Sequence, residues 1–146
     1  MRREPLPILT RAESEIMAVL WKHGRGTVHE VVSALARPVA YTTVLTLLRI
    51  LQQKGYVRHE PHPDGSRAYV YLPAVEANKA RRNHVKDLID RLFGGRPEEL
   101  ATGLIEDERL SRTQLEALKE QIERSLGDKR GAEKSGAEKK RRKESK

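Results

Sequence analysis

Apolar side chains recur at helical spacing through three successive segments in the first fifty-five residues of the chain. The first segment carries Ile16, Val19 and Leu20 on one face, and residues 28–35 and 41–54 repeat this spacing. The first two segments each follow a Thr-x-x-Glu sequence, which is the capping box that begins many helices. The pattern therefore predicts three helices.

The spacing of apolar residues then changes from a helical period to alternation. Residues 56–60 and 67–72 are rich in types that favour strands, and the turn sequence Asp64-Gly65 lies between them. Three helices followed by a β-hairpin predict a winged helix-turn-helix domain over residues 1–74.

Helical spacing returns at about residue 75, in three segments that end near residue 126. About fifty residues rarely bury enough apolar surface to form a stable core alone, so we expect residues 75–126 to form a helical dimerisation domain. The candidate residues for its interface or its core are Leu88, Leu92, Leu104, Leu115, Leu118 and Ile122. The predicted fold is thus mainly α, with a small β-hairpin as the wing.

Positive charge is concentrated at the two ends of the chain, whose formal net charge is +8. Residues 1–74 hold ten Lys or Arg and six Asp or Glu, residues 75–127 hold ten and eleven, and residues 128–146 hold nine and four. Apolar periodicity ends at Gly127, so we expect residues 127–146 to be a disordered basic tail. Such a tail either solubilises the protein or adds salt-sensitive affinity for DNA phosphates.

The composition excludes several classes of protein. There is no cysteine, which excludes disulfides and thiolate metal sites. His59-x-x-His62 is interpreted as a solvent-facing wing tip rather than half of a metal site. The sequence shows no Ser/His/Asp set, paired-carboxylate motif or glycine-rich phosphate loop, so we expect neither an enzyme nor a cofactor. It also lacks a membrane-span-length apolar run and a signal-peptide core, which favours a cytoplasmic protein.

The third helical segment, which begins YTTVLTLLRIL at Tyr41, carries an apolar stripe and an opposite polar face. The stripe consists of Val44, Leu47, Leu48 and Leu51, and the polar face of Thr42, Thr46, Arg49 and Gln53. That face lacks acidic residues, as a helix lying in a DNA groove requires. Thr and Arg side chains can contact phosphates and base edges, so we expect this helix to bind DNA. Thr43 either contacts DNA as well or bonds its own backbone.

The wing adds basic side chains to this interface. Arg58, His59 and Arg67 would lie near flanking phosphates or the minor groove. The candidate DNA-binding residues are Thr27, Tyr41, Thr42, Thr43, Thr46, Arg49, Gln53, Arg58 and Arg67.

Five segments in order resemble the penicillinase and methicillin-resistance repressor family, the BlaI/MecI/CopY-like regulators. They are LTRAESEIMAVLWKHGRGTVHEVV, AYTTVLTLLRILQQKGYVRHE, GSRAYVYLPAV, RLFGG and EDERLS, within residues 7–126. The resemblance implies a homodimer whose winged helices bind a palindromic operator and whose C-terminal helices dimerise. It also implies release from DNA when a membrane-bound sensor protease leads to cleavage of the repressor.

Two departures from the family pattern concern induction. The family's repressors are cut at an Asn-Phe bond, and Gly103-Leu104 stands at the corresponding position here. Copper-responsive relatives carry C-terminal cysteine pairs, which this chain lacks. The inducing signal, the operator and the target genes therefore stay open.

Two functions from different classes fit the sequence. The first is a homodimeric, sequence-specific repressor that excludes polymerase from a promoter. The second is a winged-helix interaction module or scaffold that has only non-specific affinity for DNA.

Overall fold

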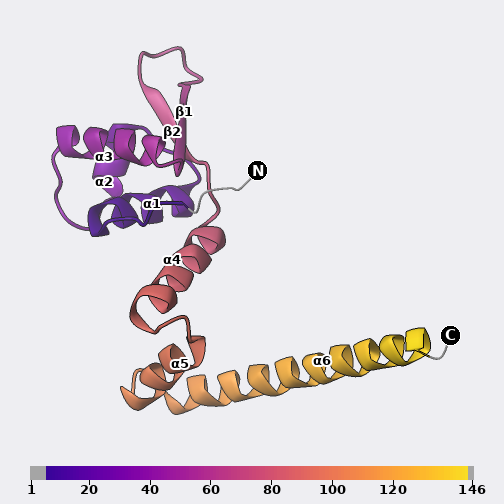
Figure 1. The fold of residues 1–146 in the computed structure, drawn as a ribbon. Coiled ribbons are helices and arrows are strands. Elements are labelled where there is room, and N and C mark those ends of the chain that lie inside the picture. Colours follow the sequence, from indigo (N-terminus) through magenta and orange to yellow (C-terminus); the bar gives the residue numbers. More distant parts are fainter. Residues whose placement is uncertain (1–5, 145–146) are drawn as a thin grey trace. The chain divides into compact units, whose positions relative to one another are not determined.

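The computed structural model describes residues 6–144, with side chains described as far as residue 136, and it divides into two compact units, Met1–Gly95 and Arg96–Lys146. The first unit contains α1 (Arg11–His23), α2 (Val28–Ala34), α3 (Tyr41–Gln53), β1 (Val57–Pro61), β2 (Tyr69–Pro73) and α4 (Ala77–Leu92). The second unit contains α5 (Pro97–Glu106) and α6 (Arg112–Glu144). Three helices followed by an antiparallel hairpin confirm the predicted winged helix-turn-helix (Figure 1).

Both predicted capping boxes are present at the starts of α1 and α2. The hydroxyl of Thr10 accepts from the N–H of Glu13, and that of Thr27 accepts from the N–H of Glu30. Each glutamate in turn accepts from the N–H of its threonine. The two helices therefore begin where their sequences predict.

The predicted apolar stripe of α3 lies in the core of the first unit. Val44, Leu48 and Leu51 are fully buried, and Leu47 is half-buried. They belong to one apolar cluster with buried residues of α1, α2 and the hairpin. Full burial of each such side chain contributes about 1.5–3 kcal/mol, so this cluster holds α3 in place with its polar face outward.

The hairpin is tied to the helices by backbone hydrogen bonds. Strand β1 pairs with β2 so that His59 lies opposite Tyr71. Gly26, in the segment between α1 and α2, donates to the carbonyl of Tyr71 at 3.0 Å and accepts from its N–H at 2.8 Å. The bridge fixes the base of the wing beside the start of α2.

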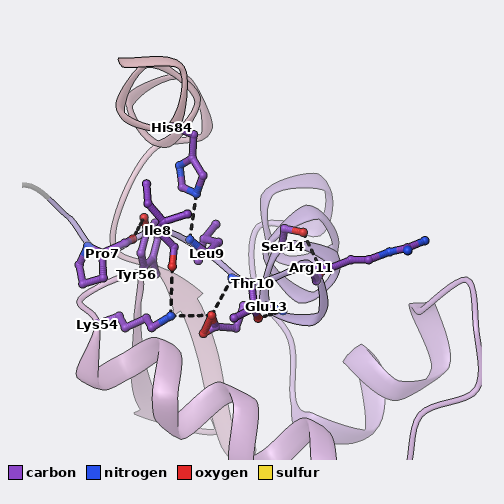
Figure 2. Close-up of polar contacts among 10 residues, drawn as sticks. All are labelled: Pro7, Ile8, Leu9, Thr10, Arg11, Glu13, Ser14, Lys54, Tyr56 and His84. Carbon is purple, nitrogen blue, oxygen red and sulfur yellow. Dashed lines mark hydrogen bonds and ion pairs between the residues drawn. The ribbon is translucent and has the colours of Figure 1, made fainter. Parts of the chain in front are cut away.

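A buried ion pair joins α1 to the end of α3 (Figure 2). Nζ of Lys54 lies 2.6 Å from Oε1 of Glu13, whose side chain is buried, and also donates to the carbonyl of Ile8 at 3.1 Å. Burial alone would raise the pKa of the Glu13 carboxyl, but the hydrogen bonds from Lys54 and Thr10 outweigh it, so the pKa is lowered. The ion pair thus also holds the segment before α1 against α3.

Helix α4 is bound to the same segment, residues 6–9. Nε2 of His84 accepts from the N–H of Leu9 at 2.9 Å, and Asn83 donates to the carbonyl of Leu6 at 2.9 Å (Figure 2 shows the histidine). We expected α4 to belong to a dimerisation domain of residues 75–126. In the structure α4 belongs to the first unit, which ends at Gly95, and these two side chains bond backbone that lies far away in the sequence. A contribution of α4 to dimerisation stays a prediction.

In the second unit, α6 begins at the third predicted capping box. The hydroxyl of Ser111 accepts from the N–H of Gln114 at 3.2 Å, and Oε1 of Gln114 accepts from the N–H of Ser111 at 2.9 Å. None of the described side chains of residues 96–136 is buried. The apolar stripes of α5 and of the first turns of α6 are therefore uncovered in a single copy of the chain.

The structure differs from the predicted disordered tail. Helix α6 continues through Gly127 and ends at Glu144. Residues 128–144 contain no proline and no β-branched residue, and most of them are Ala, Glu, Lys or Arg, which are among the better helix formers. Helix propensity here extends the backbone of α6 beyond the end of its apolar stripe.

Within residues 6–144, no helix combines the length and the apolar character needed to cross a membrane.

Candidate nucleic-acid interface

The polar face predicted for α3 is exposed in the structure. Its residues Thr42, Thr46, Arg49 and Gln53 are all accessible to solvent. No Asp or Glu occurs anywhere in the sequence of α3. The fold therefore presents a row of hydroxyl, amide and guanidinium groups without acidic neighbours on the same helix.

The structure shows which α3 threonine bonds its own helix. The hydroxyl of Thr46 donates to the carbonyl of Thr42 at 2.9 Å, whereas the sequence suggested Thr43 for such a bond. Thr43 is exposed and makes no side-chain hydrogen bond within the described part of the chain. The bond orients the Thr46 hydroxyl, whose oxygen can still accept, so Thr46 remains a candidate for contact with DNA.

The N-terminus of α3 differs from those of α1 and α2. Its N-cap residue is Ala40, which makes no side-chain cap hydrogen bond. The N–H groups of the first turn thus have no side-chain partner and are free to bind an anion. The ring of Tyr41, the first residue of α3, packs against that of His29 in α2 with centroids 4.6 Å apart.

Thr27 has a structural role as the N-cap of α2. It is half-buried, and its hydroxyl accepts from the N–H of Glu30 as the cap of α2. The same hydroxyl can still donate its own hydrogen. Contact of Thr27 with DNA stays a prediction.

The candidate DNA-binding residues of the wing lie on different faces of the hairpin. Side chains alternate along a strand, so Arg58 projects from the opposite face to its neighbour His59. Arg58 forms an ion pair with Glu60, which lies on the same side of the strand. Arg67 is exposed just before β2. Both arginines remain predicted DNA contacts. Arg58 would have to leave its ion pair with Glu60 or share it with a phosphate.

His59 lies on the hairpin face that meets α3. A cleft of about 480 Å³ separates α3 from the hairpin, and its lining residues are Leu45, Arg49, Gln52, Gln53, His59, Tyr69 and Tyr71. The sequence indicated His59, Arg49 and Gln53 but missed Gln52 and Tyr69. Gln52 and Tyr69 line the same cleft only because the hairpin packs against α3. The spacing of residues along either element does not predict this packing.

Arg49 provides positive charge in this cleft. Burial raises the pKa of Tyr71, while the charge of Arg49 acts in the opposite direction. The cleft contains no carboxylate among its lining residues. Its chemistry suits an anion rather than a cation.

The candidate dimerisation residues are all exposed in one copy of the chain. They are Leu88 and Leu92 on α4, Leu104 on α5, and Leu115, Leu118 and Ile122 on α6. The first two lie in the first unit and the other four in the second. None of the four in the second unit is buried, and their place in a dimer interface stays a prediction.

The part of the chain that the structure describes contains no cluster of three or more His, Cys, Asp or Glu residues suited to a metal ion. His62 instead lies 2.8 Å from Asp64 at the tip of the hairpin.

Comparisons with known proteins match most of the chain. The sequence model of a family described as penicillinase repressor matches residues 9–124. A penicillinase repressor from Bacillus licheniformis is 27% identical over 120 residues, which are 81% of this chain and 91% of that relative.

Two solved structures are also similar. A cysteine-to-serine mutant of MarR from E. coli matches with a TM-score of 0.50 and 18% identity, over 81% of this chain and 78% of that chain, which is a likeness of fold alone. A solution structure of monomeric BlaI from Bacillus licheniformis with the blaP half-operator matches with 30% identity and a TM-score of 0.43, over 51% of this chain and 89% of that chain.

Proposed function

The chain belongs to the penicillinase repressor family, and we propose that it is a homodimeric, sequence-specific DNA-binding repressor of transcription that occupies a palindromic operator. It acts in the cytoplasm and blocks a promoter sterically. The observation that carries the proposal is the exposed face of α3, which holds Thr42, Thr46, Arg49 and Gln53 and no acidic residue.

The roles of the α3 residues follow from their chemistry. Arg49 can donate two hydrogen bonds to one guanine, and Gln53 can bond adenine in the same way. The methyl groups of Thr42 and Thr46 suit contact with thymine methyls. In a helix-turn-helix the N-terminal part of the recognition helix contacts the bases, and both threonines lie there.

The remaining candidates would fix the protein on the phosphate backbone. We assign this role to Thr27 at the start of α2, to Tyr41 and Thr43 at the start of α3, and to Arg58 and Arg67 on the wing. The uncapped N–H groups of α3 support a phosphate at that end of the helix.

The dimer is supported by the second unit. Its apolar residues Leu104, Leu115, Leu118 and Ile122 are exposed, and the described side chains of residues 96–136 include none that is buried. A second copy can cover the same stripe by two-fold symmetry. Such a dimer would bind half-sites spaced by about one helical turn, roughly 10 base pairs, or a multiple of it.

The family is one of repressors, which agrees with the expectation that this chain is not an enzyme. The second candidate function is a winged-helix interaction module with only non-specific affinity for DNA. The two differ in what removal of the α3 polar groups does to binding.

The test is the double variant Thr46→Ala, Arg49→Ala, measured by footprinting and fluorescence anisotropy on the DNA upstream of its own gene. We expect a loss of roughly 5- to 150-fold in affinity for the protected site, since one good bidentate base contact contributes about 1–3 kcal/mol. Binding to unrelated DNA should change much less. The dimer, followed by analytical ultracentrifugation, should be unaffected.

The chain offers a matched control in the second unit. Thr102 donates to the carbonyl of Glu98 at 2.8 Å, the bond that Thr46 makes in α3, and Arg112 is exposed on α6. The variant Thr102→Ala, Arg112→Ala removes the same groups and should bind like the wild type. Equal affinity of wild type and the α3 variant for the protected site would favour the interaction module.

A further inference from the structure

The cleft between α3 and the hairpin holds a histidine whose two ring nitrogens are in different situations. Nδ1 of His59 lies 2.7 Å from the amide oxygen of Gln52. The rings of Tyr69 and Tyr71 flank the imidazole, with centroids 4.8 and 6.0 Å away. The sequence places these residues on separate elements, and only the packing of the hairpin on α3 brings them together.

We propose that this cleft binds one sugar-phosphate unit of the DNA backbone through protonated His59, so that binding of the operator takes up a proton. The proposal deepens the DNA-binding function proposed above and rests on it. It adds a site beside the base-reading face of α3 and makes operator affinity depend on pH.

The hydrogen bond that His59 donates to Gln52 determines what a neutral His59 can do. An amide oxygen only accepts, so Nδ1 must carry the hydrogen that joins them. In the neutral ring Nε2 is then an acceptor, and an acceptor repels a phosphate oxygen. Protonation places a hydrogen on Nε2 and adds a positive charge, so in this geometry His59 can donate to a phosphate through Nε2 only as the imidazolium.

The charges around His59 favour an anion in the cleft. Arg49 of α3 lines the cleft, as do the uncharged Tyr69 and Tyr71 of β2. On β1, Arg58 and Glu60 are the neighbours of His59 in sequence, and they pair with each other. A phosphate between Arg49 and His59 would favour the protonated imidazole, because an opposite charge nearby stabilises the charged form. Proton uptake would therefore accompany DNA binding.

The aromatic walls indicate which part of DNA would enter. Tyr69 is 52% exposed at the rim, and its ring can cover the apolar side of a deoxyribose while the phosphate faces Arg49 and His59. A free anion would use the charges but gain little from this ring. The ligand class is thus a sugar-phosphate unit of double-stranded DNA, next to the bases that α3 contacts.

The main test measures operator affinity of the full-length protein by fluorescence anisotropy, at constant salt, between about pH 8 and about pH 6, the range in which imidazoles gain charge. The wild type should bind roughly three- to tenfold more tightly at the lower pH. The variant His59→Gln should lose most of that gain in affinity between the two pH values. A pH profile of His59→Gln that is parallel to wild type would overturn the proposal.

His62 provides the matched control. It lies in the same hairpin and contacts Asp64 at the tip, outside the residues that line the cleft. The variant His62→Gln should keep the wild-type profile. If it loses the pH dependence as His59→Gln does, the effect belongs to the hairpin in general and the proposed site is wrong.

A second variant tests the hydrogen bond itself. Gln52→Leu removes the acceptor that holds the hydrogen on Nδ1, so a neutral ring can place it on Nε2 and donate to the phosphate. We expect tighter binding near pH 8 and a weaker pH dependence. An unchanged profile would contradict the role assigned to Gln52 and with it the proposal.

Operator DNA with single methylphosphonate substitutions locates the phosphate. One neutral position should abolish the pH dependence of the wild type and leave the pH dependence of His59→Gln unchanged; absence of such a position would overturn the proposal. Failure of this proposal can be distinguished from failure of the proposed function. If the proposed function were wrong, the wild type would protect no specific site at any pH, and the Thr46→Ala, Arg49→Ala variant would bind DNA as the wild type does.

Discussion

The first compact unit and the second differ in the burial of their apolar stripes. In α3, Val44, Leu48 and Leu51 are fully buried by the helices and hairpin around them. In α6, Leu115 and Leu118 repeat the same spacing, yet more than a third of each side chain is exposed. Both stripes predict a helix equally well. The difference shows that periodicity identifies the apolar face of a helix. Whether and by what that face is buried depends on tertiary or quaternary structure.

The end of α6 is a third case. Residues 128–144 have no apolar stripe, and the helix there depends on local propensity alone. The chain thus contains helices with a buried apolar stripe, helices with an exposed apolar stripe, and a helical extension without such a stripe. Each class should respond differently to substitution.

The largest effect is expected in the core of the first unit. Leu48→Ala should lower its free energy of unfolding by about 2–5 kcal/mol, because a cavity replaces a fully buried side chain. Urea denaturation followed by tryptophan fluorescence reports on this unit, since Trp21 lies in it. Leu118→Ala should leave this transition unchanged; an equal loss would remove the distinction between the two units.

The next effect concerns self-association of the second unit. Leu118→Asp should weaken the dimer by roughly 100-fold or more, because an unpaired charge would be buried at the interface. Analytical ultracentrifugation over a concentration series measures it. Ala117→Asp adds the same charge at an exposed position outside the apolar stripe of α6 and should dimerise normally. A normal Leu118→Asp dimer would exclude Leu118 from the interface.

The buried ion pair of the first unit should contribute less than a core leucine. Lys54→Met removes the partner of the buried Glu13 carboxyl and should cost about 2 kcal/mol of unfolding free energy, below the range for fully buried pairs because Lys54 is partly exposed. Arg37→Met removes an exposed ion pair with Glu15, 2.8 Å long, and should cost under about 0.5 kcal/mol. Similar losses in the two variants would contradict the special role of Glu13.

Acid denaturation checks the same ion pair independently. The pKa of Glu13 is lowered in the folded protein from its ordinary value of 4.5, so the unfolded state binds the proton more readily. The stability that Glu13 contributes is therefore present above pH 4.5 and declines as the pH falls below that value through the lowered folded pKa. Glu13→Gln should flatten this part of the profile.

The smallest effect is expected in the extension of α6. Gly131 and Gly136 have no atom within 4 Å of a Cβ built on them, so Gly→Ala at either position should favour the helix by about 0.5–1 kcal/mol. Far-ultraviolet circular dichroism should show an increase in helix content. Gly65, with φ of +79° at the wing tip, should respond in the opposite way to the same change. Unaltered helix content in the first two variants would indicate that residues 128–144 are not helical in solution.

Much of the fold could be predicted from local patterns. The capping boxes at Thr10, Thr27 and Ser111 each begin a helix, because a capping box satisfies backbone groups within four residues. The stripe and the polar face of α3 follow from a period of 3.6 residues. The prediction of a disordered tail is wrong for residues 128–144, which are helical. These residues lack an apolar stripe, but most of them are good helix formers.

Contacts between distant residues could not be predicted in this way. His84 of α4 accepts a hydrogen bond from the N–H of Leu9, which lies 75 residues away in the sequence, and α4 belongs to the first unit. Arg58 turns away from α3 while His59 faces it, since the orientation of the whole hairpin sets which strand face meets the helix.

The sequence by itself determined where the helices begin and where the hairpin lies, which residues of α3 are buried, and which polar face of α3 is exposed. These properties depend on the period of the backbone and on capping bonds a few residues long. Only the tertiary structure decided that Gln52, His59 and Tyr69 share one cleft and that residues 6–9 join α4 to the end of α3. The physical reason is that such contacts depend on how separate elements pack, and no local spacing encodes the direction in which one element meets another.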